Sequence, residues 1–187
     1  QMCIRDRRNE EAIKLLEEAG YSKANPLKFS ILYNTNENHK KVAIAAASMW
    51  KANTKGLIDV KLENQEWKTY IDSRRAGRYD AARAGWNADY NQATTFGNYF
   101  LSNSSNNTAK YANPEYDKAI AESYVATDAE GRAKAYAKAE EILAKDFGIV
   151  PIFNYVNPHL VKPYVKGYSG KDPQDHIYLR NLYIIKH

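Results

Sequence analysis

The residues best suited to chemistry lie in one short stretch, Tyr79 to Asn91, which reads Tyr-Asp-Ala-Ala-Arg-Ala-Gly-Trp-Asn-Ala-Asp-Tyr-Asn. Its second half brings a Trp, an acid and a Tyr together in six residues that lack the periodicity of a helix or a core strand. Gly85 admits another backbone at close range, and Arg83 presents a planar fork to a carboxylate. Trp86 offers an apolar wall, and Asp89 offers an anion to an amine. These residue types favour a binding site over a scaffold element.

The same stretch has a simpler interpretation, an edge strand that runs into a loop where Asp89 only caps a turn. Single Asp and Arg residues near a glycine are common in loops, so the residues alone leave both interpretations open. Asp72, Asp80 and Asp89 have no spacing that specifies a pair of catalytic carboxylates, and surface acids are the commoner explanation. The sequence contains no HExxH, nucleophile elbow or glycine-rich phosphate loop. We therefore predict no catalytic residue, no metal site and no cofactor.

Composition sets broad limits on the class of protein. With 187 residues, of which 44% are hydrophobic, the chain can bury a core. The net charge of +5 is mild and evenly spread, so it does not indicate a nucleic-acid partner. The single cysteine, Cys3, and four scattered histidines supply neither a disulfide framework nor a metal cluster. No apolar run approaches the roughly 20 residues that span a bilayer, and the first residues lack the apolar centre of a signal peptide.

The elements that must position these residues alternate in type. Residues 1–8 fit no pattern and look like a cloning or assembly junction, so we expect a non-native leader there and a first helix capped by Asn9 and ended by Gly20. Periodicity then predicts a strand, a helix, a strand, a helix and a strand, at Leu27 to Tyr33, His39 to Ala52, Leu57 to Leu62, Trp67 to Ala76 and Tyr79 to Ala84. This order predicts an α/β layer with parallel strands. The candidate stretch would follow the C-terminal end of a strand, where open α/β sheets bind their ligands.

The second half of the chain begins with a polar connection. Residues 91–113 are rich in Asn, Ser and Thr, carry an aromatic cluster at Phe96, Tyr99 and Phe100, and predict one short helix. Two scaffold helices follow, one opened by Pro114 and one capped by Asp128. The apolar face of the second is expected to comprise Ala133, Tyr136, Ala137, Ala139, Ile142 and Leu143. Residues 149–155 and 177–185 predict strands that dock onto a sheet whose other strands lie elsewhere.

Several motifs, in this order, resemble the C-terminal part of periplasmic oligopeptide-binding proteins, the substrate-binding components of peptide ABC importers. They are Asn-Gln-Glu-Trp-Lys-Thr-Tyr (64–70), Ala-Arg-Ala-Gly-Trp-Asn-Ala-Asp-Tyr-Asn (82–91), Ser-Ser-Asn-Asn-Thr (104–108), Tyr-Ala-Lys-Ala-Glu (136–140), Ile-Val-Pro (149–151), Leu-Val-Lys-Pro (160–163) and the terminal Asn-Leu-Tyr-Ile-Ile-Lys-His. The resemblance extends from Asn9 to His187.

The resemblance implies part of a two-lobed fold that closes on an extended peptide. Residues 9–155 would form most of the second, peptide-binding lobe, and residues 156–187 would return to the first. The implied function is to bind short peptides and deliver them to the membrane permease subunits of an ABC importer. The family implies a monomer without a nucleic-acid partner. It also implies a periplasmic location, or a lipid-anchored extracellular one in a Gram-positive host, with the signal sequence outside this chain.

The resemblance also implies roles for the residues of the candidate stretch. Asp89 would hold the α-ammonium of the peptide, and backbone groups around Ala84, Gly85 and Asn87 would pair with its main chain. Many family members have a cysteine where this chain has Asn87, so the disulfide that such a cysteine forms is absent here. A murein-peptide binder is among the relatives without it, which leaves the class of peptide open.

Further contacts follow from the same resemblance. Trp67 and Trp86 would wall roomy side-chain pockets, whereas Trp67 on its own, at a helix start, favours a core anchor. Arg83, Arg74 and His39 would face the carboxylate end of the peptide or acidic side chains. On its own, His39 would be a surface residue or helix cap, and one of the adjacent arginines at 74 and 75 would be solvated.

Two rivals come from other classes of protein. A carboxylate-dependent hydrolase would lose turnover, and not binding, when Asp72 or Asp80 is changed. A nucleic-acid binder that uses Tyr and Lys would show affinity that salt weakens strongly.

Overall fold

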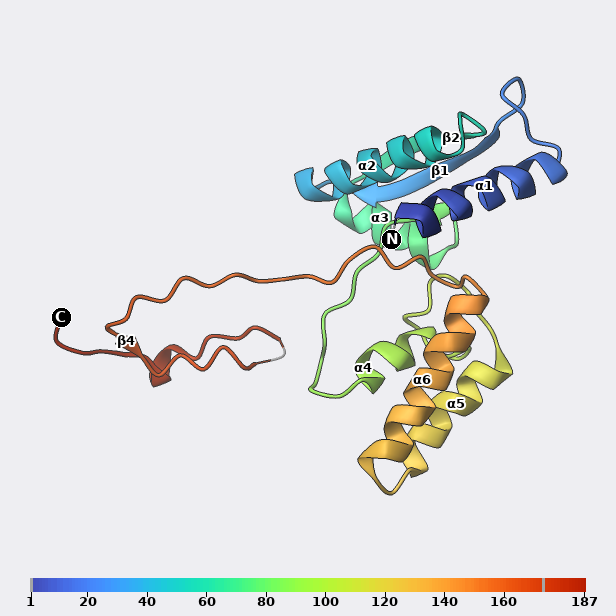
Figure 1. Cartoon of the computed structure of the whole chain (residues 1–187). Coiled ribbons are helices and arrows are strands. Elements are labelled where there is room, and N and C mark those ends of the chain that lie inside the picture. The colour runs from blue at the N-terminus through green and yellow to red at the C-terminus, as the bar shows by residue number, and fades with distance from the viewer. Residues whose placement is uncertain (1, 173) are drawn as a thin grey trace. The chain divides into compact units, whose positions relative to one another are not determined.

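The computed structural model describes residues 2–172 and 174–187, and the chain divides into two compact units, Gln1–Gly85 and Trp86–His187. The first unit runs from blue to green in Figure 1, and the second continues from green to red. Among the described residues, none of the helices combines the length and the apolar character that a membrane crossing requires.

The first unit is built on a parallel sheet, as its alternating pattern predicts. Its elements are α1 (Met2–Glu18), β1 (Leu27–Asn34), α2 (Glu37–Asn53), β2 (Ile58–Gln65), α3 (Trp67–Arg75) and β3 (Ala81–Ala82). The strand order is β2-β1-β3, and β1 pairs in parallel with both neighbours. Figure 1 shows α2 on one side of β1 and α3 on the other. The α/β prediction is thereby confirmed for this unit.

The core of this unit follows the period-2 alternation of β1. Ile31 and Tyr33 are buried with Ala43 of α2, and Phe29 packs its ring against Trp50 with centroids 5.7 Å apart. Leu32, which points to the opposite face, is fully buried.

Strand β3 is shorter than the Tyr79 to Ala84 that we expected. The carboxylate of Asp80 accepts hydrogen bonds from the Ser30 backbone N–H at 2.8 Å and from the Ser30 hydroxyl at 2.9 Å. The Asp80 side chain therefore occupies the Ser30 N–H, which a longer β3 would use for pairing with β1. After the strand, the Arg83 N–H donates to the Leu32 carbonyl at 2.8 Å, and the chain then leaves the sheet.

The prediction that Asn9 caps the first helix is wrong, because α1 already begins at Met2 and places Asn9 in its interior. Residues 2–8 contain neither glycine nor proline, so no residue in this segment stops the helix from extending backwards. The predicted stop at Gly20 is confirmed. This glycine has φ +88°, and the N–H of Tyr21 reaches back to the Leu16 carbonyl.

The second unit is built on a helical hairpin. Its elements are α4 (Thr94–Gly97), the 3-10 helix η1 (Asn98–Phe100), α5 (Pro114–Val125), α6 (Ala129–Lys145), β4 (Val165–Lys166), the 3-10 helix η2 (Leu179–Asn181) and β5 (Tyr183–Ile184). Both long helices begin where we predicted, α5 at Pro114 and α6 directly after Asp128. Asp128 accepts from the Gly131 N–H as its cap, and Asn113, which was not predicted as a cap, accepts from two N–H groups of α5. Their shared core is made by Tyr116, Ala119, Ile120, Ala139 and Leu143.

The predicted apolar face of α6 is wrong in part. Ala133 and Ala137 are exposed, whereas Ala135 is buried with Ala139 and Leu143. Alanine occurs at almost every second position of this helix, so hydrophobicity alone does not select the face that packs.

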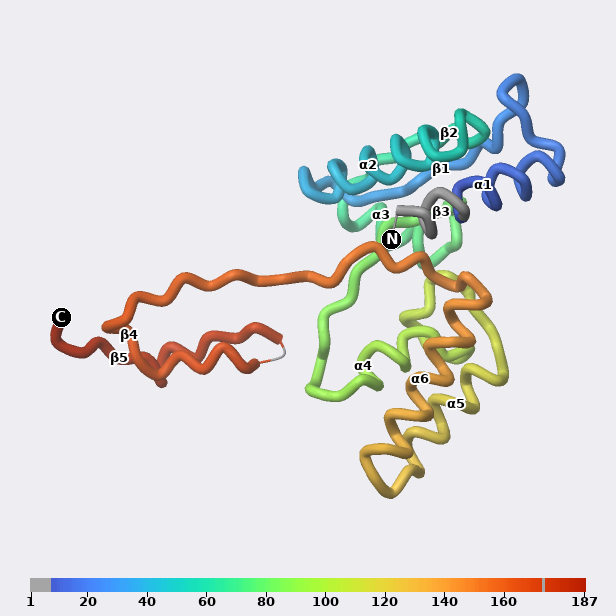
Figure 2. Tube along the Cα trace, in the orientation of Figure 1, coloured from blue at the N-terminus to red at the C-terminus, as the bar shows by residue number. Residues whose placement is uncertain are grey.

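The strand that we predicted at residues 149–155 does not form, and the predicted strand at 177–185 reduces to β5. Strand β5 pairs antiparallel with β4 over two residues each, as the tube in Figure 2 allows the reader to follow. A strand needs a neighbour for its backbone groups, and within residues 86–172 and 174–187 the segment at 149–155 has none. Gly167 is required in the hairpin, because it has φ +83° and a Cβ there would collide with the Asn181 carbonyl.

Candidate ligand-binding site

In the first unit, Tyr70 of α3 organises the cationic candidates near the end of β3. Its side chain is 1% exposed, and its hydroxyl donates to the Arg83 carbonyl. The guanidinium of Arg74 lies over the Tyr70 ring, 5.4 Å from the centroid, and is itself buried. Its neighbour Arg75 is exposed, as expected for one of the two. Trp67 is 57% exposed with its ring 5.7 Å from that of Tyr70, so it is not a core anchor.

Burial and neighbouring charges lower the pKa values of Arg83 and His39 in this cluster. Burial lowers the pKa of Arg83, the nearby Arg74 lowers it further, and Tyr70 acts in the opposite direction. Burial, and then the positive charge of Arg83, hold the pKa of His39 below its ordinary value of 6.5. The imidazole Nδ1 lies 2.8 Å from the side-chain oxygen of Asn34, at the end of β1. At neutral pH, His39 is therefore an uncharged hydrogen-bonding group, while Arg83 keeps its charge.

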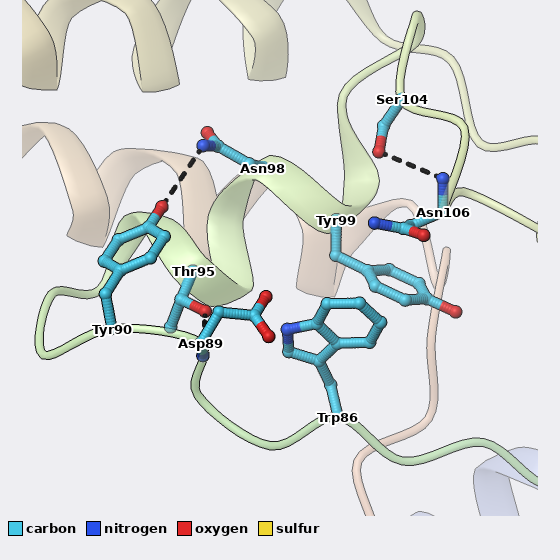
Figure 3. A pocket seen from close by; sticks show the side chains of 8 residues that line it. All are labelled: Trp86, Asp89, Tyr90, Thr95, Asn98, Tyr99, Ser104 and Asn106. Carbon is cyan, nitrogen blue, oxygen red and sulfur yellow. Dashed lines mark hydrogen bonds between the residues drawn. The ribbon is translucent and has the colours of Figure 1, made fainter. Parts of the chain in front are cut away.

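In the second unit, two of the candidates line one cavity. Trp86 and Asp89 share a space of about 160 Å³ with Tyr90, Thr95, Asn98, Tyr99, Ser104 and Asn106. The edge of Tyr99 packs against the Trp86 ring with centroids 5.0 Å apart. Figure 3 shows the Asp89 carboxylate on the same side as the indole nitrogen of Trp86. Among the residues that the structure describes, this buried nitrogen has no hydrogen-bond partner. The cavity thus combines an exposed acceptor, an unused donor and an aromatic wall.

The structure brings only some of the predicted site residues to this cavity. Asn87 is exposed and is not among the lining residues. Ala84 and Gly85 are exposed at the end of the other unit. Of the six other lining residues, Tyr90 lies in the candidate stretch without an assigned role, and the remaining five were not predicted as site residues. Tyr99 was noticed only as a member of an aromatic cluster, and Ser104 and Asn106 only as part of a polar connection.

Two acids outside the cavity, Asp80 and Asp72, lie in different surroundings. The backbone N–H and then the hydroxyl of Ser30 hold the pKa of Asp80 below its usual range, so this carboxylate is a poor proton donor. Asp72 is exposed on α3. Among the described side chains, no three His, Cys, Asp or Glu residues are grouped so that they could hold a metal ion.

Known proteins match this chain over most of its length. Residues 5–108 match the family described as Bacterial extracellular solute-binding proteins, family 5 Middle. The chain is 97% identical over 180 residues to the periplasmic oligopeptide-binding protein OppA of Haemophilus influenzae, which covers 96% of this chain and 33% of that protein. It is 48% identical over 179 residues to the periplasmic murein peptide-binding protein MppA of Escherichia coli, with 96% and 33% covered.

A solved structure agrees with the same assignment. The crystal structure of Haemophilus influenzae OppA in complex with RPPGFSPFR matches with a TM-score of 0.86 at 95% identity, covering 97% of this chain and 35% of that one. The chain thus spans about a third of the length of these relatives, and its α/β fold is a part of their larger two-lobed fold. The family match, the identities and this structural likeness confirm the resemblance in the motifs: the chain belongs to family 5 of the bacterial extracellular solute-binding proteins.

Proposed function

We propose that a protein carrying this chain binds short peptides in extended form and delivers them to the membrane permease subunits of an ABC importer. The observation that carries the proposal is the cavity in which the Asp89 carboxylate is exposed beside the aromatic wall of Trp86 and Tyr99. The names of the relatives and the peptide in the OppA complex point to the same ligand class.

Each group in the cavity has a role in this proposal. The carboxylate of Asp89 holds the α-ammonium of the peptide, a charge-assisted contact that gains strength when water is excluded. The ring of Trp86 walls a side-chain pocket, and its buried N–H lies on the same side as the Asp89 carboxylate (Figure 3). The backbone around Ala84, Gly85 and Asn87 pairs with the peptide main chain, which is consistent with the exposure of all three residues.

A second part of the proposal, which rests on the family resemblance, concerns the cationic cluster of the first unit. Arg83 and Arg74 attract the carboxylate end or acidic side chains, and Trp67 walls a further pocket with its exposed ring. His39 acts there as a neutral hydrogen-bonding group near pH 7 and becomes a cation only at lower pH.

We further propose that residues 9–155 belong to the peptide-binding lobe and that residues 156–187 return to the other lobe. Support comes from the exposure of Val156 and Leu160, 81% and 102%, which suits a segment that packs on other parts of a longer chain. The proposed location is the periplasm, which the names of the relatives support, and the proposed state is a monomer.

The proposal is tested by calorimetry on a protein of the relatives' full length that carries this chain. A tripeptide with a free N-terminus is expected to bind about 10- to 100-fold more tightly than its N-acetylated form, because a hydrogen bond to a charged group contributes about 1.5–3 kcal/mol. Asp89→Asn should remove this preference. Asp72→Asn, which neutralises an exposed acid of α3, serves as the matched control and should keep it. Equal affinities of the native protein for the two peptides would overturn the assignment.

A murein peptide is the second candidate ligand, favoured by the 48% identity to MppA. Competition between a murein tripeptide and an ordinary tripeptide in the same calorimeter separates the two. Displacement of the ordinary peptide by an equimolar murein tripeptide would favour this second candidate.

A further inference from the structure

We propose that Thr95 is a positioning residue for Asp89, so that its hydroxyl sets the selectivity of the cavity for a ligand ammonium. This inference rests on the proposed function, because it concerns the same cavity. Thr95 is 4% exposed, and its Oγ1 accepts a hydrogen bond from the Asp89 backbone N–H at 2.9 Å. The contact spans six residues and fixes the backbone from which the carboxylate projects (Figure 3).

The loop between the two residues is closed by further bonds. The Gln92 N–H donates to the Tyr90 carbonyl at 2.9 Å, and the Thr95 N–H donates to the Gln92 carbonyl at 3.1 Å. The Tyr90 hydroxyl donates to the Oγ1 of Thr94 at 3.1 Å. Asp89 therefore lies at the start of a compact turn. The hydroxyls of Thr94 and Thr95, the first two residues of α4, hydrogen-bond to this turn.

The short helix α4 is itself fixed to the core of the second unit. The hydroxyl of Tyr116, a fully buried residue of α5, donates to the Gly97 carbonyl at 2.8 Å. A Cβ at Gly97 would lie 2.7 Å from the Cδ1 of buried Ile120, so the Ile120 side chain would have to shift to admit a larger residue there. Rigid packing thus extends from α5 through α4 and Thr95 to Asp89, which is the support that a precisely oriented binding group requires.

A positioning role for Thr95 predicts different effects on charged and uncharged N-termini of the peptide. If Thr95 positions Asp89, loss of its hydroxyl weakens the binding of a free ammonium more than the binding of an acetylated N-terminus. A Thr95 that merely shapes the cavity would affect both ligands alike. The quantity to measure is therefore the ratio of the Kd of the N-acetylated tripeptide to the Kd of the free tripeptide, in the full-length protein.

Thr95→Val keeps the volume of the side chain and removes the acceptor, so we expect the ratio to fall about fivefold, as for loss of a neutral hydrogen bond. Thr95→Ala should lower it in the same direction. Thr95→Ser, which restores the hydroxyl, should return the ratio to within about twofold of the native value. Ser123→Ala removes another buried hydroxyl, one that bonds to Ile120 within α5 and is not among the lining residues, and should leave the ratio unchanged.

Asp89→Asn provides the decisive background. Thr95→Val in that background should change the ratio no further, because its effect passes through the Asp89 carboxylate. A further fall would mean that Thr95 contacts the ammonium itself, and it would overturn the positioning role. An unchanged ratio in Thr95→Val, or equal weakening of both peptides, would overturn the inference and leave the proposed function standing. A native ratio of one would instead overturn the proposed function and, with it, this inference.

Discussion

His39 illustrates how the surroundings of a single residue change the charge that its type suggests. The family resemblance assigns it to the carboxylate end of a peptide as one of three basic groups. Burial and the neighbouring Arg83 lower its pKa, so it carries no charge near pH 7. The Asn34 side chain holds the ring in place through Nδ1. Sequence alone reveals the imidazole but not the cation beside it, because Arg83 lies 44 positions further along the chain.

The shifted pKa of His39 predicts a pH dependence of stability. In the window between its folded pKa and the unfolded value of about 6.5, the unfolded chain binds more protons than the folded one. Stability therefore falls as the pH falls from about 6.5 through the folded pKa. The groups that face His39 are Arg83 and Asn34.

His39→Gln, which keeps a polar side chain without the titration, should lose less stability between pH 7.5 and 5.5 than the native protein. Urea unfolding at the two pH values measures the difference. His176→Gln, at an exposed position, is the matched control. An identical pH slope in His39→Gln and the native protein would contradict the assignment.

At the level of elements, the α5–α6 hairpin is joined by one carboxylate. Asp146 caps the end of α6 and accepts from the Tyr111 hydroxyl at 2.7 Å and from the Asn113 side-chain N–H at 2.6 Å. Burial, and then the bond to Asp146, raise the pKa of Tyr111 to about 12. Both bonds end on the same oxygen, while the oxygen of Asn113 caps α5.

This arrangement predicts coupling between the two donors. Asn113→Ala should lower the free energy of unfolding by about 1–2 kcal/mol, because it removes a helix cap as well as the bond to Asp146. Tyr111→Phe should cost about 1 kcal/mol. A double-mutant cycle measured by urea unfolding should show an interaction energy of at least about 0.5 kcal/mol. Strict additivity would show that Asp146 does not connect the two residues.

Helix ends that depend on residues a few positions away were predictable from the sequence. Strands that depend on pairing with a distant segment were not. Asp128 and Asn113–Pro114 define the starts of α6 and α5 through bonds within four residues, and Gly20 ends α1 in the same way. The strand at 149–155 failed because pairing depends on a neighbour that local periodicity does not reveal. Within the site, Asp89 and Trp86 were recognisable by residue type, whereas Thr95 joins them only through the fold of the loop.

For the molecule as a whole, the C-terminal segment is the feature with the largest consequence. Large apolar side chains are exposed along it; Val150, Ile152, Phe153, Val156 and Leu160 are examples. Apolar surface of this extent marks an interaction site or an aggregation liability in a soluble protein. The relatives are about three times longer, and the proposed partner for this segment is the remainder of such a chain.

We therefore expect residues 9–187 alone to bind peptides at most weakly and to bind an apolar dye strongly. Calorimetry and dye fluorescence, compared with the full-length protein, measure both effects. A chain ending at residue 146 should bind much less dye, since it lacks the exposed segment. Undiminished peptide affinity of residues 9–187 would show that the proposed division into lobes is misplaced.

The three tryptophans of the chain lie in three different surroundings. Trp86 stands in the cavity against Tyr99, Trp67 is largely in water, and Trp50 is half-buried against Phe29. Indole emission shifts to shorter wavelength when water leaves the ring, so these residues report separately on the cavity, the solvent and the core. Within this chain, Trp67→Phe would leave Trp86 and Trp50 as indole reporters, and of these two only Trp86 lines the cavity.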